Sequence, residues 1–346
     1  MRTAVFHETF ASDERLWPSP TIRGWMLAFA LALFSLPLWG SDYALAIACI
    51  VGIHVIATLG LNLTTGNAGL ISLSHGAFLG VGCYAVAWLS KQGVPFYLAL
   101  PAAGFVTAAL GLIVGLPSLR VKGLYLAIAT LAAHFILTFI FREWDSVTGG
   151  VPGTSIPRAK LFAFEFAGDR RSFYLIFGCA FVMAIAARNL ARTHIGRAFV
   201  AVRDRDFSAE ILGVNLLRTK LLAFAIGAFY AGVAGGLLGY FYGAITPEYF
   251  VLTLSVFYLA AIIVGGLGTV LGSVLGALFM TFVPELLRLV AHASSQWLPG
   301  IAGLLLPMGQ VVFGLLIIAF LILEPHGLAA IWARIRRLFH LWPFRT

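Results

Sequence analysis

Long apolar runs recur along most of the chain, and they constrain its fold more than any other feature. Each run, as a helix of about 20 residues, can cross a hydrocarbon core about 30 Å thick. Strands of a transmembrane barrel would be shorter and would alternate in polarity. The sequence therefore predicts an all-α polytopic membrane protein with about ten transmembrane helices. The predicted spans are 24–40, 43–63, 70–90, 96–117, 122–141, 172–190, 219–242, 250–266, 271–290 and 301–323.

Charged residues are too scarce for a water-soluble protein of this length. They make up 11% of the 346 residues, against about 25% in soluble domains. The net charge of +9 does not indicate nucleic-acid binding, because the basic residues lie between apolar runs. Such a distribution follows the positive-inside bias of membrane proteins.

The basic clusters predict the orientation. An even number of spans places both termini on one side, and Arg120 with Lys122, the segment 188–220 and the basic C-terminal tail all fall on that side. We therefore expect cytoplasmic N and C termini. The resulting division of the chain is an N-terminal segment 1–23, a permease domain 24–323 with a periplasmic loop 142–171 and a cytoplasmic loop 191–217, and a tail 324–346.

The cytoplasmic loop has the sequence features of two short helices. Thr193 is a suitable N-cap for the first helix, and Asp206 for the second, while Gly213 suits its C-terminal end. Three apolar residues with helical spacing form a stripe on the first helix, namely Ile195, Phe199 and Val202. The stripe is compatible with lying on anionic lipid or with docking to a cytosolic partner, and composition does not decide between them.

One predicted span is too polar and too rich in glycine to be a continuous lipid-facing helix. Residues 60–82 read GLNLTTGNAGLISLSHGAFLGVG. Broken backbone at membrane depth is tolerated where protein or a water-filled cavity satisfies its polar groups. Packing and a role in the solute pathway are both compatible with this stretch. The candidate pathway residues are Asn62, Asn67, Ser72, Ser74 and His75.

Glycines four residues apart, as at Gly268, Gly272 and Gly276 and again at Gly111 and Gly115, favour tight helix packing over ligand binding.

Residue patterns for catalysis or cofactor binding are missing. The glycine-rich GGLGTVLGS lacks the lysine of a Walker motif, and the sequence contains no catalytic cluster, so we expect neither an enzyme nor an ATP site, cofactor or metal. The scattered cysteines, Cys49, Cys83 and Cys179, are interpreted as buried packing residues. The same interpretation is favoured for His54, His75 and His134, and Glu285 with Arg288 is interpreted as an interfacial ion pair.

Six sequence blocks, in order, resemble the permease subunits of branched-chain amino-acid ABC transporters, and the LivM type most of all. The blocks are GLNLTTGNAGLISLSHGAFLGVGCYA (60–85), VKGLYLAIATLA (121–132), TGGVPG (148–153), IGRAFVAVRDRDFSAEILGVN (195–215), KLLAFAIGAFYAGVAGGLLG (220–239) and IIVGGLGTVLGSVLGA (262–277). The resemblance covers about residues 45–325.

The resemblance implies a multi-pass protein of the bacterial inner membrane that imports hydrophobic amino acids. Its implied partners are a LivH-type permease, two cytoplasmic ATPase subunits and a periplasmic substrate-binding protein. It also implies that the segment 195–215 meets the ATPase subunits. The matching positions are Gly196, Arg197, Ala201, Arg203, Glu210 and Gly213. Phe207 stands where the general importer pattern has glutamate. Outlying basic residues such as Arg188 and Lys220 are interpreted as topology determinants.

Three alternatives remain open from the sequence. The chain could be a stand-alone secondary transporter or channel, for which the polar stretch 60–82 is the favourable evidence. It could be a membrane enzyme, although no catalytic cluster supports this. It could also be an ABC permease for urea or short amides, since the sequence does not determine the solute.

Overall fold

The computed structural model describes most of the chain. Residues 1–19 of the predicted N-terminal segment and residues 342–346 of the tail lie outside the described part. The described ranges are 20–161, 164–165, 168–295, 302–324 and 326–341.

Each of the ten predicted spans coincides with a helix. These are α2 (Pro20–Trp39), α3 (Asp42–Leu61), α4 (His75–Lys91), α5 (Phe96–Gly115), α6 (Leu124–Glu143), α8 (Asp169–Arg192), α10 (Leu216–Tyr242), α11 (Leu252–Gly265), α12 (Val270–Ser295) and α13 (Ala302–Leu323). The main difference is that the span predicted over 70–90 becomes helical only at His75.

Shorter elements join and extend these helices. They are the π-helical turn η1 (Asn62–Asn67), the 3-10 turns η2 (Leu116–Leu119) and η3 (Pro247–Phe250), and the helices α7 (Asp145–Thr148), α9 (His194–Ile211) and α14 (Leu328–Leu341). Four two-residue strands are also present, namely β1 (Thr154–Ser155), β2 (Lys160–Leu161), β3 (Phe164–Glu165) and β4 (Ala244–Ile245).

Six helices in the described part of the chain are long and apolar enough to cross a membrane. They are α3 continued by η1, α5 continued by η2, α6, α8, α10 and the first 21 residues of α12. The prediction of a helical, polytopic membrane protein is therefore confirmed. The count of ten spans and the cytoplasmic position of the termini remain predictions.

Helices α3 and α10 form the centre of the bundle. Their apolar windows are 67% and 72% buried, whereas those of the other four long helices are 28–39% buried. Helix α10 packs against α3, α4 and α5, and α3 packs also against α8 and α12. Since the lipid-facing helices present apolar side chains outward, the core is recognised by its small residues and buried polar groups rather than by hydrophobicity.

Close packing explains the glycines with four-residue spacing. A Cβ atom at Gly276 would overlap the Ala261 carbonyl group of α11, and one at Gly272 would overlap the Gly266 carbonyl oxygen. A Cβ at Gly111 would lie 2.5 Å from the Ala228 side chain of α10. The predicted packing role is thus confirmed for Gly111, Gly272 and Gly276, but it is wrong for Gly268, which lies in the α11–α12 connection with a φ of +78° and so shares no helix face with the other two.

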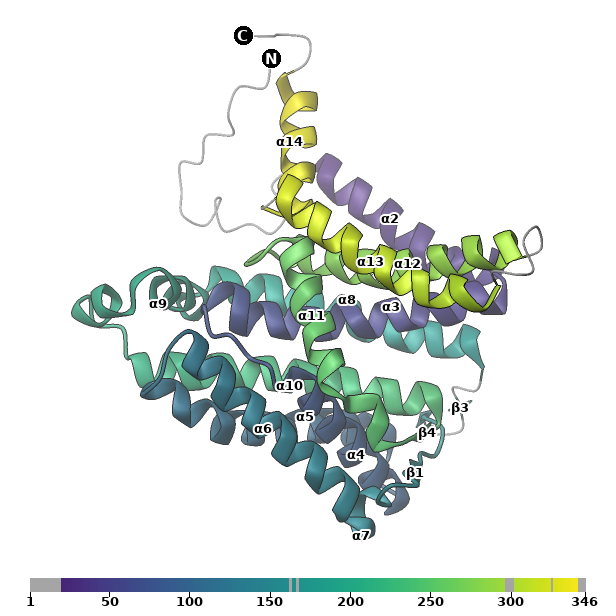
Figure 1. Ribbon diagram of the computed structural model, residues 1–346. Helices are drawn as coiled ribbons and strands as arrows, with labels where there is room; N and C mark the ends of the chain where they lie inside the picture. Colours follow the sequence, from purple (N-terminus) through teal and green to yellow (C-terminus); the bar gives the residue numbers. More distant parts are fainter. Residues whose placement is uncertain (1–19, 162–163, 166–167, 296–301, 325, 342–346) are drawn as a thin grey trace.

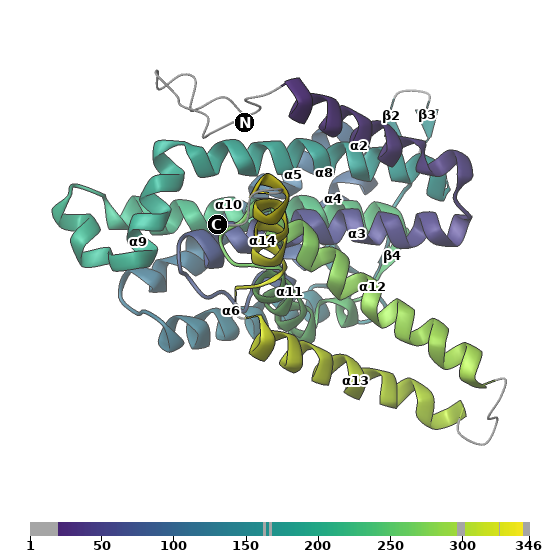
Figure 2. The ribbon, with the colours of Figure 1, turned by 90° about the horizontal axis from the view of Figure 1, so that it is seen from above.

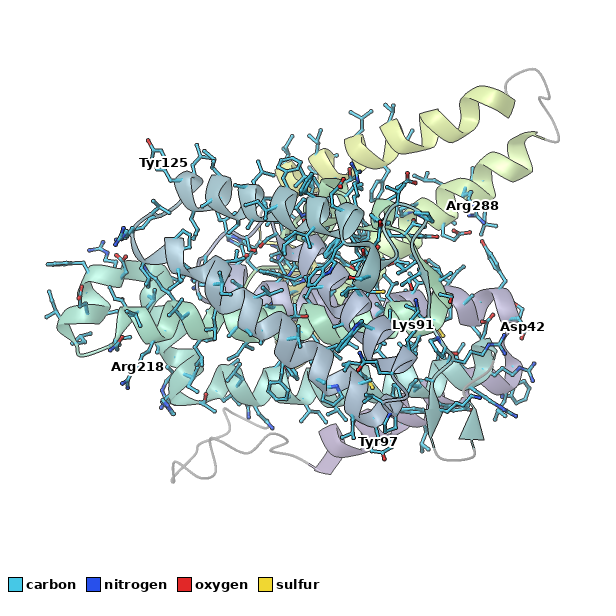
Figure 3. The ribbon with its side chains drawn as sticks, turned by 90° about the horizontal axis from the view of Figure 1, so that it is seen from below. Asp42, Lys91, Tyr97, Tyr125, Arg218 and Arg288 are labelled. Atoms are coloured by element: carbon cyan, nitrogen blue, oxygen red, sulfur yellow. The ribbon has the colours of Figure 1, made fainter. Side chains whose placement is uncertain are left out.

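The bundle has two distinct ends. Helix α9 projects from one end, and α7 and the short strands lie at the other (Figures 1 and 2). Arg218 and Tyr125 lie toward the α9 end, while Asp42, Lys91 and Arg288 lie toward the opposite end (Figure 3). Strand β1, from the loop 142–171, pairs antiparallel with β4, with Thr154 opposite Ile245. The loops predicted to be cytoplasmic and periplasmic therefore lie at opposite ends.

Candidate coupling and translocation site

The predicted break in the stretch 60–82 is present. Helix α3 ends at Leu61, the chain makes one π-helical turn to Asn67, and residues 68–74 are irregular before α4 begins at His75. The candidate residues Asn62, Asn67, Ser72, Ser74 and His75 are all at least 93% buried. The break therefore lies inside the protein, where neighbouring helices can satisfy its polar groups.

The side chain of Asn62 joins the break to the α11–α12 connection. Its amide nitrogen donates to the Thr269 carbonyl and to Ser273 Oγ, both at 2.8 Å. Its amide oxygen accepts from the backbone N–H of Gly268 at 2.8 Å. With three hydrogen bonds to one segment, Asn62 holds the end of α3 against the start of α12.

His75 has partners on α3 and α11, and the two serines contact each other. His75 Nε2 donates to the Ala57 carbonyl of α3 at 2.8 Å, and its ring packs edge-on against Tyr258 of α11. The hydroxyls of Ser72 and Ser74 lie 3.1 Å apart. The five candidate residues are thus all buried at or beside the break, where Asn62 contacts the segment 268–273 and His75 contacts α3 and α11.

Two further residues satisfy the irregular backbone, and the sequence analysis missed both. Thr130 Oγ1 of α6 accepts from the N–H of Leu73 at 3.0 Å, and Ser255 Oγ of α11 accepts from the N–H of Gly76 at 2.8 Å. His134 lies 3.4 Å from Ser255 Oγ through its Nδ1. A polar side chain in an otherwise apolar run was the available signal, but its partner was not evident from sequence.

Helix α9 begins as predicted. The Thr193 hydroxyl accepts from the Gly196 N–H at 3.5 Å. Phe199 is fully buried and packs with Ala68, Leu126 and Phe224, while Ile195 packs against this cluster. The apolar stripe of α9 is thus covered by the protein itself, which leaves it unavailable for lying on lipid.

Arg203 connects α9 directly to the break. Its Nη1 donates to the Gly66 carbonyl in η1 at 2.9 Å, and its Nε binds Asp204. Its aliphatic stem lies against Gly69, where a Cβ atom would approach Arg203 Cγ to 2.8 Å. Gly69 has a φ of +70°, so both its conformation and the close approach favour glycine.

The second predicted helix begins one residue earlier than expected. The helix break is at Arg205, which has extended dihedral angles (φ −156°, ψ 99°), so Asp206 is the first residue after the break rather than the cap. The Asp206 carboxylate accepts from the Phe207 N–H at 2.9 Å. The same carboxylate also forms ion pairs with two lysines.

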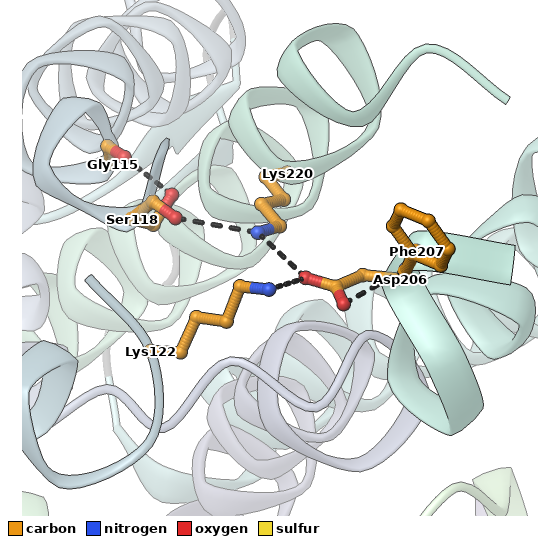
Figure 4. A network of polar contacts seen from close by, with 6 residues as sticks. All are labelled: Gly115, Ser118, Lys122, Asp206, Phe207 and Lys220. Carbon is orange, nitrogen blue, oxygen red and sulfur yellow. Dashed lines mark hydrogen bonds and ion pairs between the residues drawn. The ribbon is translucent and has the colours of Figure 1, made fainter. Parts of the chain in front are cut away.

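Asp206 binds two lysines from other parts of the bundle (Figure 4). One oxygen contacts Lys122, before α6, and lies 3.6 Å from Nζ of Lys220 in α10. Lys220, whose side chain is 4% exposed, also donates to the Ser118 carbonyl at 3.4 Å. The hydrogen bond from Lys122 and the charges of both lysines lower the pKa of Asp206. The interpretation of Lys220 as a mere topology determinant is therefore too simple.

The far end of α9 exposes apolar side chains. Phe207, Ile211 and Leu212 are 73%, 70% and 83% exposed. The helix then ends in a Schellman turn, in which Gly213 (φ +90°) donates to the Glu210 carbonyl and Val214 donates to that of Ala209. The predicted C-terminal role of Gly213 is confirmed, whereas the exposed apolar tip was not foreseen.

The remaining candidate residues of the loop lie along α9 in different settings. Gly196 is buried at the turn from α8, where a Cβ would lie 2.5 Å from the Leu190 and Ala191 carbonyl oxygens. Arg197 is exposed and donates to the Arg192 carbonyl at 3.1 Å. Ala201 is half-buried, and Glu210 is exposed next to the apolar tip.

The other sequence interpretations concern packing. His54 contacts Thr281 Oγ1 at 3.0 Å, and the three cysteines are free thiols, two of them buried. Arg288 lies 3.6 Å from Glu285, and Tyr43 binds the same carboxylate. The described residues contain no group of histidines, cysteines and carboxylates suited to a metal.

Comparisons with known proteins identify similar permease proteins. The chain is 33% identical, over 306 residues, to the high-affinity branched-chain amino acid transport system permease protein LivM of Salmonella typhimurium and to that of Escherichia coli; each match covers 81% of the chain and 72% of the relative. It is 28% identical to the probable permease protein LivH of Methanocaldococcus jannaschii, over 82% of the chain and 91% of that protein. No solved structure matches the chain.

A model of the family described as the branched-chain amino acid transport system / permease component matches residues 43–321. This range contains the helices from α3 to nearly the end of α13, the broken stretch and α9. The chain therefore belongs to this family of permease components.

Proposed function

We propose that the chain is one of two permease subunits of an ATP-binding-cassette importer in a bacterial inner membrane. It moves branched-chain or other hydrophobic amino acids into the cytoplasm, and separate ATPase subunits supply the energy. The second permease is of the LivH type, and a periplasmic binding protein delivers the solute. The supporting observation is the exposed apolar tip of α9, on a helix whose Phe199 and Val202 are buried against a family-matched bundle.

The contacts of α9 suggest how energy reaches the pathway. A force on the tip is transmitted through Arg203 to η1 and through Asp206 to α10 and the start of α6. The first route reaches the end of α3 and the second reaches α10, and these two are the most buried of the long helices. In this proposal the wall of the pathway includes Asn62, Asn67, Ser72, Ser74 and His75, so displacement of η1 changes access to it.

Reconstitution tests the proposal. The chain is incorporated into proteoliposomes with the second permease, with or without the ATPase subunits, and uptake of labelled leucine is measured in the presence of the binding protein. We expect uptake only when the ATPase subunits and ATP are present. ATP-independent uptake by the chain alone would instead support a stand-alone secondary transporter.

A double variant, Phe207→Glu with Leu212→Glu, tests the docking role of the tip. Charging it should abolish co-purification of the ATPase subunits and ATP-dependent uptake, while the fold is retained because both side chains are largely exposed. Val151→Glu, on a residue 65% exposed in the loop 142–171, is the matched control and should retain both. Normal ATPase binding by the double variant contradicts the docking proposal.

The solute is tested separately. Uptake of labelled leucine by a deletion strain carrying the chain and its partners is challenged with isoleucine, valine, urea and short amides. Competition by the branched-chain amino acids is expected. Competition by urea or amides alone assigns the permease to that solute class instead.

A further inference from the structure

Helix α14 follows the family-matched region and has a distinct composition. It starts five residues after α13 ends, at Leu328, and lies beyond the matched residues 43–321. Helix α13 has 22 residues without a charged side chain, or about 33 Å at 1.5 Å per residue. Helix α14 thus follows an apolar helix and begins beside the α11–α12 connection, where Gly327 lies against Gly266.

An apolar stripe follows one face of α14. Leu328, Ile331, Trp332 and Ile335 have the i, i+3, i+4, i+7 spacing of a single helix face. At 100° per residue, Arg334 and Arg336 fall at the two edges of this stripe. Apolar residues flanked by arginines are typical of helices that lie in a membrane interface, where tryptophan is also common.

The structure fixes the position of α14 but leaves part of its stripe uncovered. Arg334 forms two hydrogen bonds with the Glu324 carboxylate, at 3.0 and 3.4 Å. Gly327 packs so closely on Gly266 that a Cβ would lie 2.6 Å from its backbone nitrogen. Trp332 and Ile335 nevertheless remain 54% and 40% exposed.

The direction of α14 matches a membrane surface. It stands apart from the bundle and runs crosswise to α10 in Figure 1, and the view in Figure 2 looks along it. Helix α10 is long and apolar enough to cross a membrane, and if it does so, a helix crosswise to it runs along the plane of that membrane.

We propose that α14 is an interfacial helix that binds the anionic phospholipid surface of the cytoplasmic leaflet through Trp332, Ile335 and Arg336. Arg336 is exposed and at the edge of the stripe, where it can reach lipid phosphates while the apolar residues enter the acyl boundary. The inference rests on the membrane orientation in the proposed function, but it is independent of the solute and of ATP.

The test uses the full chain in nanodiscs, with the three native cysteines replaced by alanine. A spin label at Trp332→Cys reports on the stripe, and one at Ala333→Cys, on the opposite face, is the matched control. Discs contain either phosphatidylcholine alone or phosphatidylcholine with roughly one-third phosphatidylglycerol. Accessibility to oxygen and to a water-soluble nickel chelate is measured with and without the second permease.

We expect the label at 332 to enter the lipid phase with phosphatidylglycerol and the label at 333 to remain in water. Arg336→Glu changes the charge of α14 by two units. It should lower the ratio of lipid-bound to water-exposed α14 about 30-fold, since each charge near an anionic surface contributes about a fivefold effect. Two results would overturn the proposal: a label at 332 that stays in water in both lipids, or one that is protected only by the second permease. Neither depends on whether the complex transports amino acids.

Discussion

Single polar residues carry much of the specificity of this bundle. In a membrane protein, apolar side chains contact lipid as well as they contact each other, so buried hydrogen bonds and ion pairs distinguish one arrangement of helices from another. Asn62 illustrates this through its hydrogen bonds to Gly268 and Thr269. Asp206 illustrates it through its ion pairs with Lys122 and Lys220.

Asn62→Ala should lower the thermal stability of the purified protein. It leaves the Gly268 N–H and Ser273 Oγ without their present partner, at a cost of about 1–3 kcal/mol for unsatisfied buried groups. Thermal unfolding in detergent measures the effect. Thr138→Ala is the control, since its hydroxyl binds only carbonyls of its own helix. Equal midpoints for both variants would show that the Asn62 contacts contribute little.

Asp206→Asn should destabilise the protein by about 2 kcal/mol, because it leaves buried Lys220 without a charged partner. Asp204→Asn, which removes an exposed pair on the same helix, should cost less than about 1 kcal/mol. Adding Lys220→Met to Asp206→Asn should restore part of the loss, as a double-mutant cycle on thermal unfolding can measure. Absence of any coupling between positions 206 and 220 argues against the ion pair.

The pH dependence of this contribution has a definite sign. Lys122 and Lys220 lower the pKa of Asp206 below its ordinary value of 3.8. The stabilisation is therefore fully present above that value and is lost as pH falls through the lower, folded-state pKa. The difference in stability between the native protein and Asp206→Asn should stay constant from about pH 5 to 8.

At the scale of elements, apolar runs form the helices, and small residues determine where two helices can pack closely. Helix α10 packs closely on α4, where Gly82 faces the Gly232 backbone, and α12 packs closely on α11 at Gly276. In α8, Gly178 has no role in helix packing, because a Cβ atom there would meet nothing within 4 Å.

Gly276→Ala and Gly178→Ala should therefore have opposite effects. A methyl group at 276 overlaps the Ala261 carbonyl, so helices α11 and α12 must separate, at a cost of about 1–3 kcal/mol for overpacking. At 178 the same change should stabilise the helix by up to about 1 kcal/mol. Thermal unfolding of the two variants in one detergent checks this; a stable Gly276→Ala protein would contradict tight packing.

At the scale of the whole molecule, the exposed tip of α9 and the loop 142–171 lie at two ends of one bundle. The apolar tip of α9 lies at one end, and the loop 142–171, joined to β4, lies at the other. Between these ends, Arg203 contacts Gly66 in η1 and Asp206 contacts Lys220 in α10, which is the route of the proposed transmission.

Cysteine labelling from each side of the membrane tests the predicted orientation. With native cysteines replaced, Leu212→Cys should react with an impermeant maleimide only in inverted vesicles, and Val151→Cys only in right-side-out cells. Both parent side chains are more than 60% exposed, so neither position needs unfolding to react. The reversed pattern would place α9 in the periplasm and remove its proposed contact with the ATPase subunits.

The sequence by itself was sufficient to predict where the helices lie, where the stretch 60–82 is broken, how Thr193 and Gly213 bound α9, and which family the chain resembles. These features depend on local properties: the length of an apolar run, the hydrogen bonds of a helix end and the order of short sequence blocks. Their physical causes act within a few residues, so these features can be predicted from consecutive residues of the sequence.

Only the tertiary structure decided which polar groups meet. Asn62 binds Thr269, 207 residues away, and Lys220 lies against Ser118 and Asp206, although its position at the start of a span suggested only a topological role. The exposure of Phe207 and Leu212 and the crosswise course of α14 were likewise unavailable from sequence. Such features depend on how helices pack, and packing in a bilayer is set by shape and by paired polar groups rather than by hydropathy.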